Sequence, residues 1–339
     1  MSVPLSVLDV APVPGNGTAA DALRNSLDLA AHVEALGYTR YWVAEHHNMP
    51  GIASSSPPVL LAHLGGVTST MRLGAGGVML PNHSSVAVAE QFGMLEALHP
   101  GRIDLAIGRA PGTDPVTARA LRRASIDVDE FPEQLAELLG YFRGDLPADH
   151  PYAGIRATPA RGFEPALWML GSSGYGAQLA GELGWPFGFA HHFSPGNTVP
   201  ALRIYRHHFR PSAPLAAPYA LVAVSVLCAP TDDEADYLAG SGRLGFLRLR
   251  SGRPGPFPSP AEAAEYRYTP SEKAFVESWT ASHVVGSPAT VRAGLLELLE
   301  RTGAQELMVT TNAYDHADRV RSYELVAQAW QLAPSIVTR

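Results

Sequence analysis

Short apolar segments alternate with longer amphipathic segments from one end of this chain to the other. The short segments are rich in β-branched residues, and several are continuously apolar, as strands are when both faces of a sheet are covered. Eight of them are predicted as strands: Leu5–Val10, Arg40–Ala44, Arg72–Val78, Ile103–Ile107, Ala166–Leu170, Pro186–Ala190, Ala220–Leu227 and Glu306–Thr311. Strands that alternate with helices in this way build a parallel sheet.

The segments between the predicted strands carry helix signals. The first is complete, because Thr18 can cap the helix, Asp21 follows three residues later, and Gly37 stands just past the end. Further helices are predicted at Pro58–Ser69, Ser84–Leu98, Phe131–Phe142, Gly176–Leu183, Asp232–Arg250, Pro288–Arg301 and Asp315–Gln331. Eight strand–helix units predict an α/β fold, a (β/α)8 TIM barrel that forms a single domain over residues 1–339.

Two regions interrupt this rhythm. Gly144–Glu164 is rich in Pro and Gly, and Ser251–Val285 begins Pro-rich and continues with polar and aromatic residues. We expect both to be insertions in loops that follow strands, at the mouth of the barrel, where the active sites of this fold lie and where loops can form lids. A linker between two domains is the alternative for the second region.

Composition narrows the class of protein. The 339 residues are 46% hydrophobic and 17% charged, which fits a well-buried globular core. No stretch reaches the roughly 18 to 20 apolar residues that a membrane span requires, and the first residues lack the basic start of a signal peptide. The single cysteine, Cys228, fits a reducing, cytoplasmic location. A net charge of −7 without basic runs argues against a nucleic-acid partner.

Polar residues gather directly after the predicted strands, where a barrel has its active site. The sequence GSSG at 171–174 follows the fifth strand and opens a helix, and Arg109 follows the fourth strand. Free N–H groups at a helix start, two hydroxyls from Ser172 and Ser173, and a guanidinium together predict a phosphate site. In the alternative interpretation the serines only cap the helix at Gly176, and Arg109 pairs with Asp104 or Asp114.

The third predicted strand contains glycines at positions 74, 76 and 77. No helix begins directly after them, so they are not a dinucleotide-binding fingerprint. They mark a place where a flat ligand contacts bare backbone, or alternatively where the strand bends.

Histidine pairs follow two strands, at 46–47 and at 191–192. Neighbouring residues of an extended segment point to opposite sides, so each pair offers one inward imidazole, which suits a general acid or base. A two-histidine metal site with Glu45 or Asp9, as in a metal-dependent hydrolase, is an alternative.

Five segments together resemble a known family. They are YWVAEHH at 41–47, LGAGGVMLP at 73–81, PGRIDLAIGR at 100–109, LGSS at 170–173 and VGSP at 285–288. In this order they resemble the bacterial-luciferase-like, flavin-dependent monooxygenases, over nearly the whole chain and most closely the single-chain branch. The resemblance implies a TIM barrel, FMN used as FMNH2 from a separate flavin reductase, and oxidation of a small organic substrate by O2 through a flavin C4a-hydroperoxide.

The resemblance also implies roles for individual residues. Arg109, Ser172, Ser173 and the backbone near Gly176 would hold the FMN phosphate. Gly76 and Gly77, often joined by a cis peptide in this family, would pack against the flavin ring, with His191 at its border. His46 matches the catalytic histidine, and Gly108 stands where the luciferase large chain has a reactive cysteine, so no thiol chemistry is expected. The residues expected to face substrate are Asp9, Pro12, Asn48, His83, His192, Phe257, Tyr266 and Tyr268.

The last two expectations concern the oligomeric state and the alternative functions. Family members commonly dimerise through helices beside the second and third strands, which here are 58–69 and 84–98, so a homodimer is expected. A deazaflavin-dependent oxidoreductase that transfers hydride is one alternative function. A non-catalytic flavin-binding protein is another.

Overall fold

A computed structural model describes residues 3–110, 112–121 and 130–335. Its strands are β1 (Leu5–Asp9), β2 (Arg40–Val43), β3 (Arg72–Met79), β4 (Ile103–Gly108), β5 (Ala166–Gly171), β6 (Phe187–Ala190), β7 (Ala220–Cys228), β8 (Val284–Gly286) and β9 (Glu306–Thr310). The order β6-β5-β4-β3-β2-β1-β9-β7 closes on itself because β6 pairs with β7, and every pairing is parallel. The predicted TIM barrel is confirmed, and β8 is an additional short strand beside β7.

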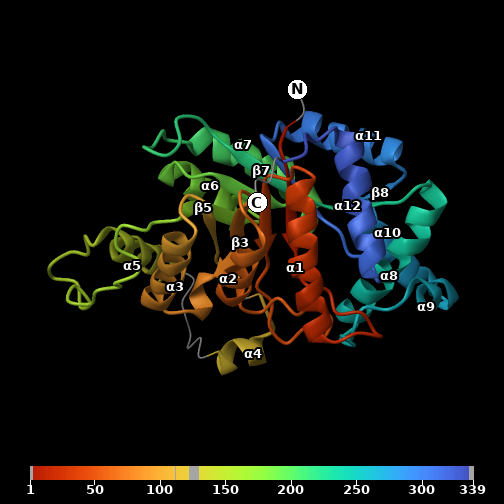
Figure 1. The fold of residues 1–339 in the computed structure, drawn as a ribbon, viewed down its shortest axis with the longest axis horizontal. Coiled ribbons are helices and arrows are strands. Elements are labelled where there is room, and N and C mark those ends of the chain that lie inside the picture. The colour runs from red at the N-terminus through yellow and green to blue at the C-terminus, as the bar shows by residue number, and fades with distance from the viewer. Residues whose placement is uncertain (1–2, 111, 122–129, 336–339) are drawn as a thin grey trace.

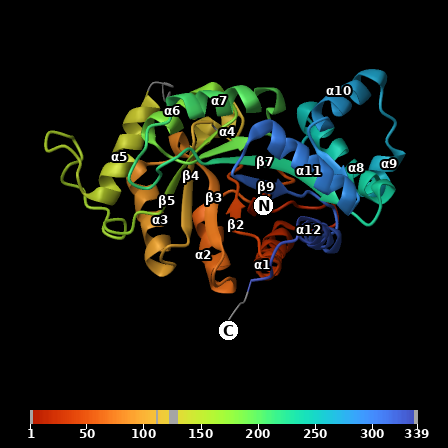
Figure 2. The same cartoon turned by 90° about the horizontal axis from the view of Figure 1, so that it is seen from above.

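Helices surround the barrel on its outer side (Figures 1 and 2). They are α1 (Ala19–Ala35), α2 (Pro57–Val67), α3 (Ser85–Leu98), α5 (Phe131–Arg143), α6 (Gly174–Leu183), α7 (Thr198–His208), α11 (Pro288–Thr302) and α12 (His316–Trp330). The first helix starts as its sequence predicts: the Thr18 hydroxyl accepts from the Asp21 N–H at 3.2 Å, and the Asp21 carboxylate accepts from the Thr18 N–H at 3.0 Å.

The barrel interior has an apolar upper part and a charged lower end. Arg40 begins β2 and donates to Asp104 and Glu306, each at 2.8 Å, while its guanidinium lies 4.7 Å from the Trp168 ring centre. The Tyr219 hydroxyl adds a bond to Glu306 at 2.7 Å. These residues lie at or near the starts of their strands, with Tyr219 directly before β7, so they fill the N-terminal end of the barrel. A ligand site is therefore confined to the opposite end.

The two interrupted regions lie at different ends of the barrel. Residues 144–164 connect α5 to β5 and so precede a strand rather than follow one. The expectation that they lie at the mouth is wrong, because a connection from a helix back to the next strand belongs to the N-terminal end.

Residues 251–285 belong to a longer excursion between β7 and α11 that begins with α8 (Asp232–Arg250). It continues with α9 (Pro260–Glu265) and α10 (Pro270–Thr280), and these three helices gather at one side of the barrel (cyan, Figure 1). A short helix α4 (Pro115–Ala120) follows β4. In the part of the chain that is described, no helix combines the length and the apolar character that crossing a membrane would need.

Candidate active site

The C-terminal ends of the strands open into a cavity of about 840 Å³. Its floor is the apolar upper layer of the barrel interior, formed by residues such as Leu8, Trp42 and Met308. This volume lies in the upper part of the usual range for small-molecule sites.

One corner of the cavity joins the end of β4 to the start of α6. Arg109, Ser172, Ser173 and Gly176 all line it. The Arg109 guanidinium lies 3.9 Å from the centre of the Tyr175 ring, which belongs to the first turn of α6. The sequence placed these groups on two different strand–helix units, and the fold brings them together.

The alternative for this corner was that the serines only cap the helix and that Arg109 pairs with Asp104 or Asp114. The structure shows neither arrangement. Ser173 occupies the N-cap position of α6 but its side chain makes no capping hydrogen bond. Asp104 is bound by Arg40 and Arg72, and Asp114 caps α4 and accepts from Asn48. Among the described residues no carboxylate pairs with Arg109, so the guanidinium and both hydroxyls can receive an anion.

The glycines of β3 form a flat part of the wall. The peptide between Gly76 and Gly77 is cis, and Gly76 lines the cavity. A Cβ at Gly76 would lie 2.8 Å from the Trp42 ring, and one at Gly77 would lie 2.7 Å from the Ala106 carbonyl oxygen. Neither position accepts a side chain without displacement of a neighbour. Gly77 itself packs against the barrel wall and does not line the cavity.

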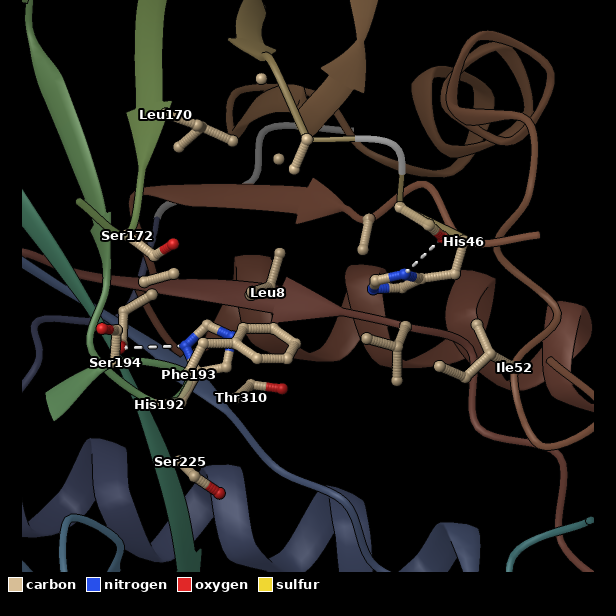
Figure 3. Close-up of a pocket in the computed structure, with 18 of the residues that line it drawn as sticks. Leu8, His46, Ile52, Leu170, Ser172, His192, Phe193, Ser194, Ser225 and Thr310 are labelled. Atoms are coloured by element: carbon tan, nitrogen blue, oxygen red, sulfur yellow. Dashed lines mark hydrogen bonds between the residues drawn. The ribbon is translucent and has the colours of Figure 1, made fainter. Parts of the chain in front are cut away.

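Two of the three histidines that line the cavity, His46 and His192, enter it from opposite sides (Figure 3). His46 follows β2 and places Nδ1 3.4 Å from the Gly112 carbonyl oxygen, and burial lowers its pKa. His192 follows β6, has Nδ1 3.1 Å from the Ala223 carbonyl oxygen, and burial lowers its pKa to about 4. Both imidazoles are therefore neutral at neutral pH.

Glu45 holds two histidines that do not line the cavity, His47 and His83. Its buried carboxylate lies 3.0 Å from Nε2 of His47 and 2.8 Å from Nε2 of His83, and it accepts from the Met79 N–H at 3.0 Å. Burial would raise the pKa of this carboxyl, but the hydrogen bonds from His83, His47 and Met79 hold it below its ordinary value. Glu45 thus ties the loop that holds His46 to the end of β3 and the segment that follows it.

Several predicted site residues lie outside the cavity. Asp9 is fully buried against the helix layer, where its carboxylate pairs with Arg319 at 2.5 Å and accepts from Ser26 and Tyr41. Strand alternation explains this position: Leu8 and Val10 face the cavity, so Asp9 between them faces outward. Asp9 is a structural residue, contrary to the expectation that it faces substrate.

The same correction applies to other residues. His191 points away from the cavity and lies 2.7 Å from the Thr198 hydroxyl, whereas His192 next to it lines the wall. Asn48 donates to Asp114 at 3.0 Å, and His83 is held by Glu45. Of the other residues that were expected to face substrate, Pro12 and Phe257 line the cavity, while Tyr266 and Tyr268 do not.

One wall of the cavity was missed by sequence reasoning. Phe246 of α8 and Trp279 of α10 stack with ring centres 3.7 Å apart, and both line the cavity. The wall continues with polar residues next to β7, β8 and β9: Ser225, His283, Thr310 and Asn312. Only the last two carried a signal in the sequence, because they stand at the end of a predicted strand.

Backbone hydrogen bonds fasten the loops around the mouth. The Phe257 N–H donates to the Val13 carbonyl at 2.8 Å, the Gly15 N–H donates to the Phe257 carbonyl at 2.9 Å, and the Val13 N–H donates to the Gly51 carbonyl at 2.9 Å. The loops after β1 and β2 and the excursion after β7 therefore form one connected rim.

A family model described as luciferase-like monooxygenase matches residues 3–306. The chain belongs to the luciferase-like monooxygenase family. It is 46% identical over 325 residues to a luciferase-like monooxygenase of Escherichia coli strain K12, with 96% of each chain covered. It is 35% identical over 328 residues to the N-acetyl-S-alkylcysteine monooxygenase of Bacillus subtilis strain 168, covering 96% of this chain and 97% of that protein.

The crystal structure of apo-MsnO8 has the same architecture, with a TM-score of 0.87 at 36% identity over 98% of this chain and 100% of that one. The present chain, a luciferase-like monooxygenase, is therefore an oxidoreductase with a TIM-barrel fold. The part of the chain that the structure describes contains no group of three or more His, Cys, Asp or Glu arranged to hold a metal ion.

Proposed function

We propose that this protein is a monooxygenase that uses FMNH2 and O2 to oxidise a small organic substrate, with the reduced flavin supplied by a separate flavin reductase. The observation that carries the proposal is the corner where Arg109 meets the N-terminus of α6. A guanidinium, two free hydroxyls and the N–H groups of a helix start are the donors that a phosphate monoester requires.

The rest of the cavity fits the remainder of FMN. The phosphate would be held by Arg109, Ser172, Ser173 and Gly176. The flat ring system would lie against the backbone at Gly76, which is bare because a Cβ there would meet the Trp42 ring. When bound, the reduced flavin supplies the electrons with which O2 is activated.

The protein's own contribution is to exclude water and to move a proton. Leu8, Val10 and Ile52 give the cavity an apolar lining, and Ile52 lies near His46 (Figure 3), so water is poorly accommodated where the reaction takes place. His46 lies on the β2 side of the cavity with its pKa lowered by burial, so at neutral pH its imidazole can take a proton from the substrate and return it.

Rapid mixing tests this function. Protein loaded anaerobically with FMNH2 is mixed with O2, and the flavin spectrum is followed. We expect an absorbance transient distinct from both the reduced and the oxidised flavin, followed by oxidised FMN. Direct reoxidation without a transient would point to a passive flavin-binding protein. Selection of a deazaflavin over FMN, with turnover in the absence of O2, would point to hydride transfer.

We also propose that the protein is a homodimer. Helices α2 and α3 lie side by side and expose large apolar side chains: Leu98 is 65% exposed, Val59 63%, Met94 52% and Val67 44%. Exposed apolar surface of this kind marks protein contacts. Analytical ultracentrifugation should give twice the chain mass, and the double change Val59→Asp and Leu98→Asp should give the monomer. A monomer in the unaltered protein would refute the proposal.

A further inference from the structure

One face of the cavity takes no part in the proposed flavin binding or in the proton transfer proposed for His46. It is formed by the upper ends of β7 and β9, by His283 just before β8, and by α8 and α10. The register aligns Ser225 of β7 with Thr310 of β9 on one side, and Val226 with Val284 on the other. His283, Ser225 and Thr310 therefore stand at nearly one level, and Asn312 follows above Thr310.

Two side chains on this face have polar atoms that the protein does not satisfy. Oδ1 of Asn312 and Nε2 of His283 are buried, and neither has a hydrogen-bond partner among the described residues. Buried polar atoms without partners are uncommon in native proteins, and a cavity that contains them is suited to a ligand that completes their hydrogen bonds. Both residues line the cavity.

The same face lacks charge. Among the described residues that line the cavity, Arg109 alone has a permanent charge, and it lies at the phosphate corner. Burial lowers the pKa of His283 to about 4, and the pKa of His192 likewise, so both imidazoles are neutral at neutral pH. A carboxylate or an ammonium placed here would lose its hydration without gaining an opposite charge.

The apolar part of this face is flat and aromatic. Phe246 and Trp279 are stacked at an interplanar angle of 8°, and the Trp279 ring meets His283 edge-on with centres 4.3 Å apart. Phe257 and Leu249 extend the surface toward the rim. Such a surface favours a ring or another flat apolar body.

We propose that this face is the substrate subsite and that it selects an uncharged molecule with a flat apolar body and a hydroxyl group, as in a phenol. The inference rests on the proposed function, which places the flavin on the β3–β5 side of the same cavity. The hydroxyl is chosen because Asn312 Oδ1 requires a donor, and a neutral His283 can provide either a donor or an acceptor at Nε2. A hydroxyl group supplies both functions from one atom.

Isothermal titration calorimetry on the protein saturated with oxidised FMN tests the subsite with three matched probes: 2-naphthol, 2-methoxynaphthalene and 2-naphthoate. We expect 2-naphthol to bind most tightly. The methyl ether should bind roughly 10-fold more weakly, the effect of about one net hydrogen bond. The carboxylate should bind at least about 10-fold more weakly, because it has no cation to meet. Equal affinities for the three probes, or no binding of 2-naphthol, would overturn the proposal.

Variants locate the effect. Asn312→Leu and His283→Phe should each weaken 2-naphthol by roughly 3- to 10-fold and leave 2-methoxynaphthalene almost unchanged. Tyr266→Phe is the control, since its hydroxyl bonds Glu272 in the same excursion and lies outside the cavity. An unchanged preference for the hydroxyl in both subsite variants would also overturn the proposal. FMN titration distinguishes a failure of the proposed flavin site from a failure of the proposed subsite. If the unaltered protein does not bind FMN, the flavin site is contradicted. If it binds FMN but does not discriminate between the probes, only the subsite is contradicted.

Discussion

Replacement of Arg109 by alanine should weaken FMN selectively over riboflavin. The two ligands share the ring system and the ribityl chain and differ in the phosphate. The structure makes the change clean, because the guanidinium contacts the Tyr175 ring and pairs with no carboxylate among the described residues. Its removal therefore leaves no buried charge unpaired, and the direct cost to folding is limited to a cation–π contact of about 0.5–1 kcal/mol.

The magnitude follows from the type of bond that is lost. A hydrogen bond between charged partners contributes about 1.5–3 kcal/mol, which corresponds to roughly a 10- to 150-fold increase in the Kd of FMN. Riboflavin should change by less than about 2-fold, since no phosphate is present to lose a partner. Quenching of flavin fluorescence on titration with protein measures both constants.

A nearby arginine provides the control for this measurement. Arg119 on α4 is exposed and does not line the cavity, so Arg119→Ala removes the same charge from the same side of the molecule without touching the site. It should leave both ligands unchanged. Equal losses of FMN and riboflavin affinity in Arg109→Ala, or an FMN loss in the Arg119 variant of the same size, would refute the phosphate assignment.

Three further changes separate structural from chemical roles. Asp9→Asn leaves Arg319 buried without its carboxylate and should reduce the free energy of unfolding by about 3–5 kcal/mol, against less than about 1 kcal/mol for the exposed Asp28→Asn; similar denaturation midpoints for the two would contradict this. Burial lowers the pKa of His283 to about 4 in the folded chain, against about 6.5 in the unfolded chain. Between these two pH values the unfolded chain binds a proton that the folded chain does not, so the free energy of unfolding falls on acidification, and His283→Phe should reduce that fall by up to roughly 3 kcal/mol. Identical pH profiles of stability would show that His283 is not buried in its neutral form. His46→Ala should keep FMN affinity but lower the product formed per O2 consumed, with a rate loss of about 10²- to 10⁴-fold; an unchanged yield removes His46 from the mechanism.

Much of the fold was readable because its signals are local. The eight barrel strands are short, largely apolar segments, and the first helix has a complete capping box. Three of the helices that were not predicted, α4, α9 and α10, also carried a signal. Each begins with a capping residue followed by proline, at Asp114–Pro115, Ser259–Pro260 and Thr269–Pro270, with Glu262 and Glu272 three residues after the last two caps. Proline at the first helical position favours a helix start, but in a Pro-rich stretch it reads as a loop.

The candidate site was predicted where position along a strand is enough, and mistaken where orientation decides. His46, Arg109 and Ser172 follow their strands and reach the cavity as expected. Asp9 and His191 also lie at strand ends, but each is offset by one residue from the inward-facing set, and a continuous apolar run gives no sign of which set faces inward. The polar neighbours that hold them, Ser26 and Thr198, belong to the helices that follow, α1 and α7, 17 and 7 residues further along the chain.

The aromatic wall could not be predicted for a different reason. Phe246 and Trp279 belong to helices of the excursion after β7, and their meeting depends on how that excursion folds back over the barrel. No spacing along the chain encodes this contact. The chemistry of the flavin corner is therefore more visible in the sequence than the selection of the substrate.

A crystal structure of the protein with bound FMN tests the central claim most directly. We expect the phosphate to lie between Arg109 and the first turn of α6, with the ring system against Gly76 and with His46 on the opposite side of the cavity. A phosphate bound at another part of the molecule, or a ring system that leaves Gly76 uncovered, would contradict it.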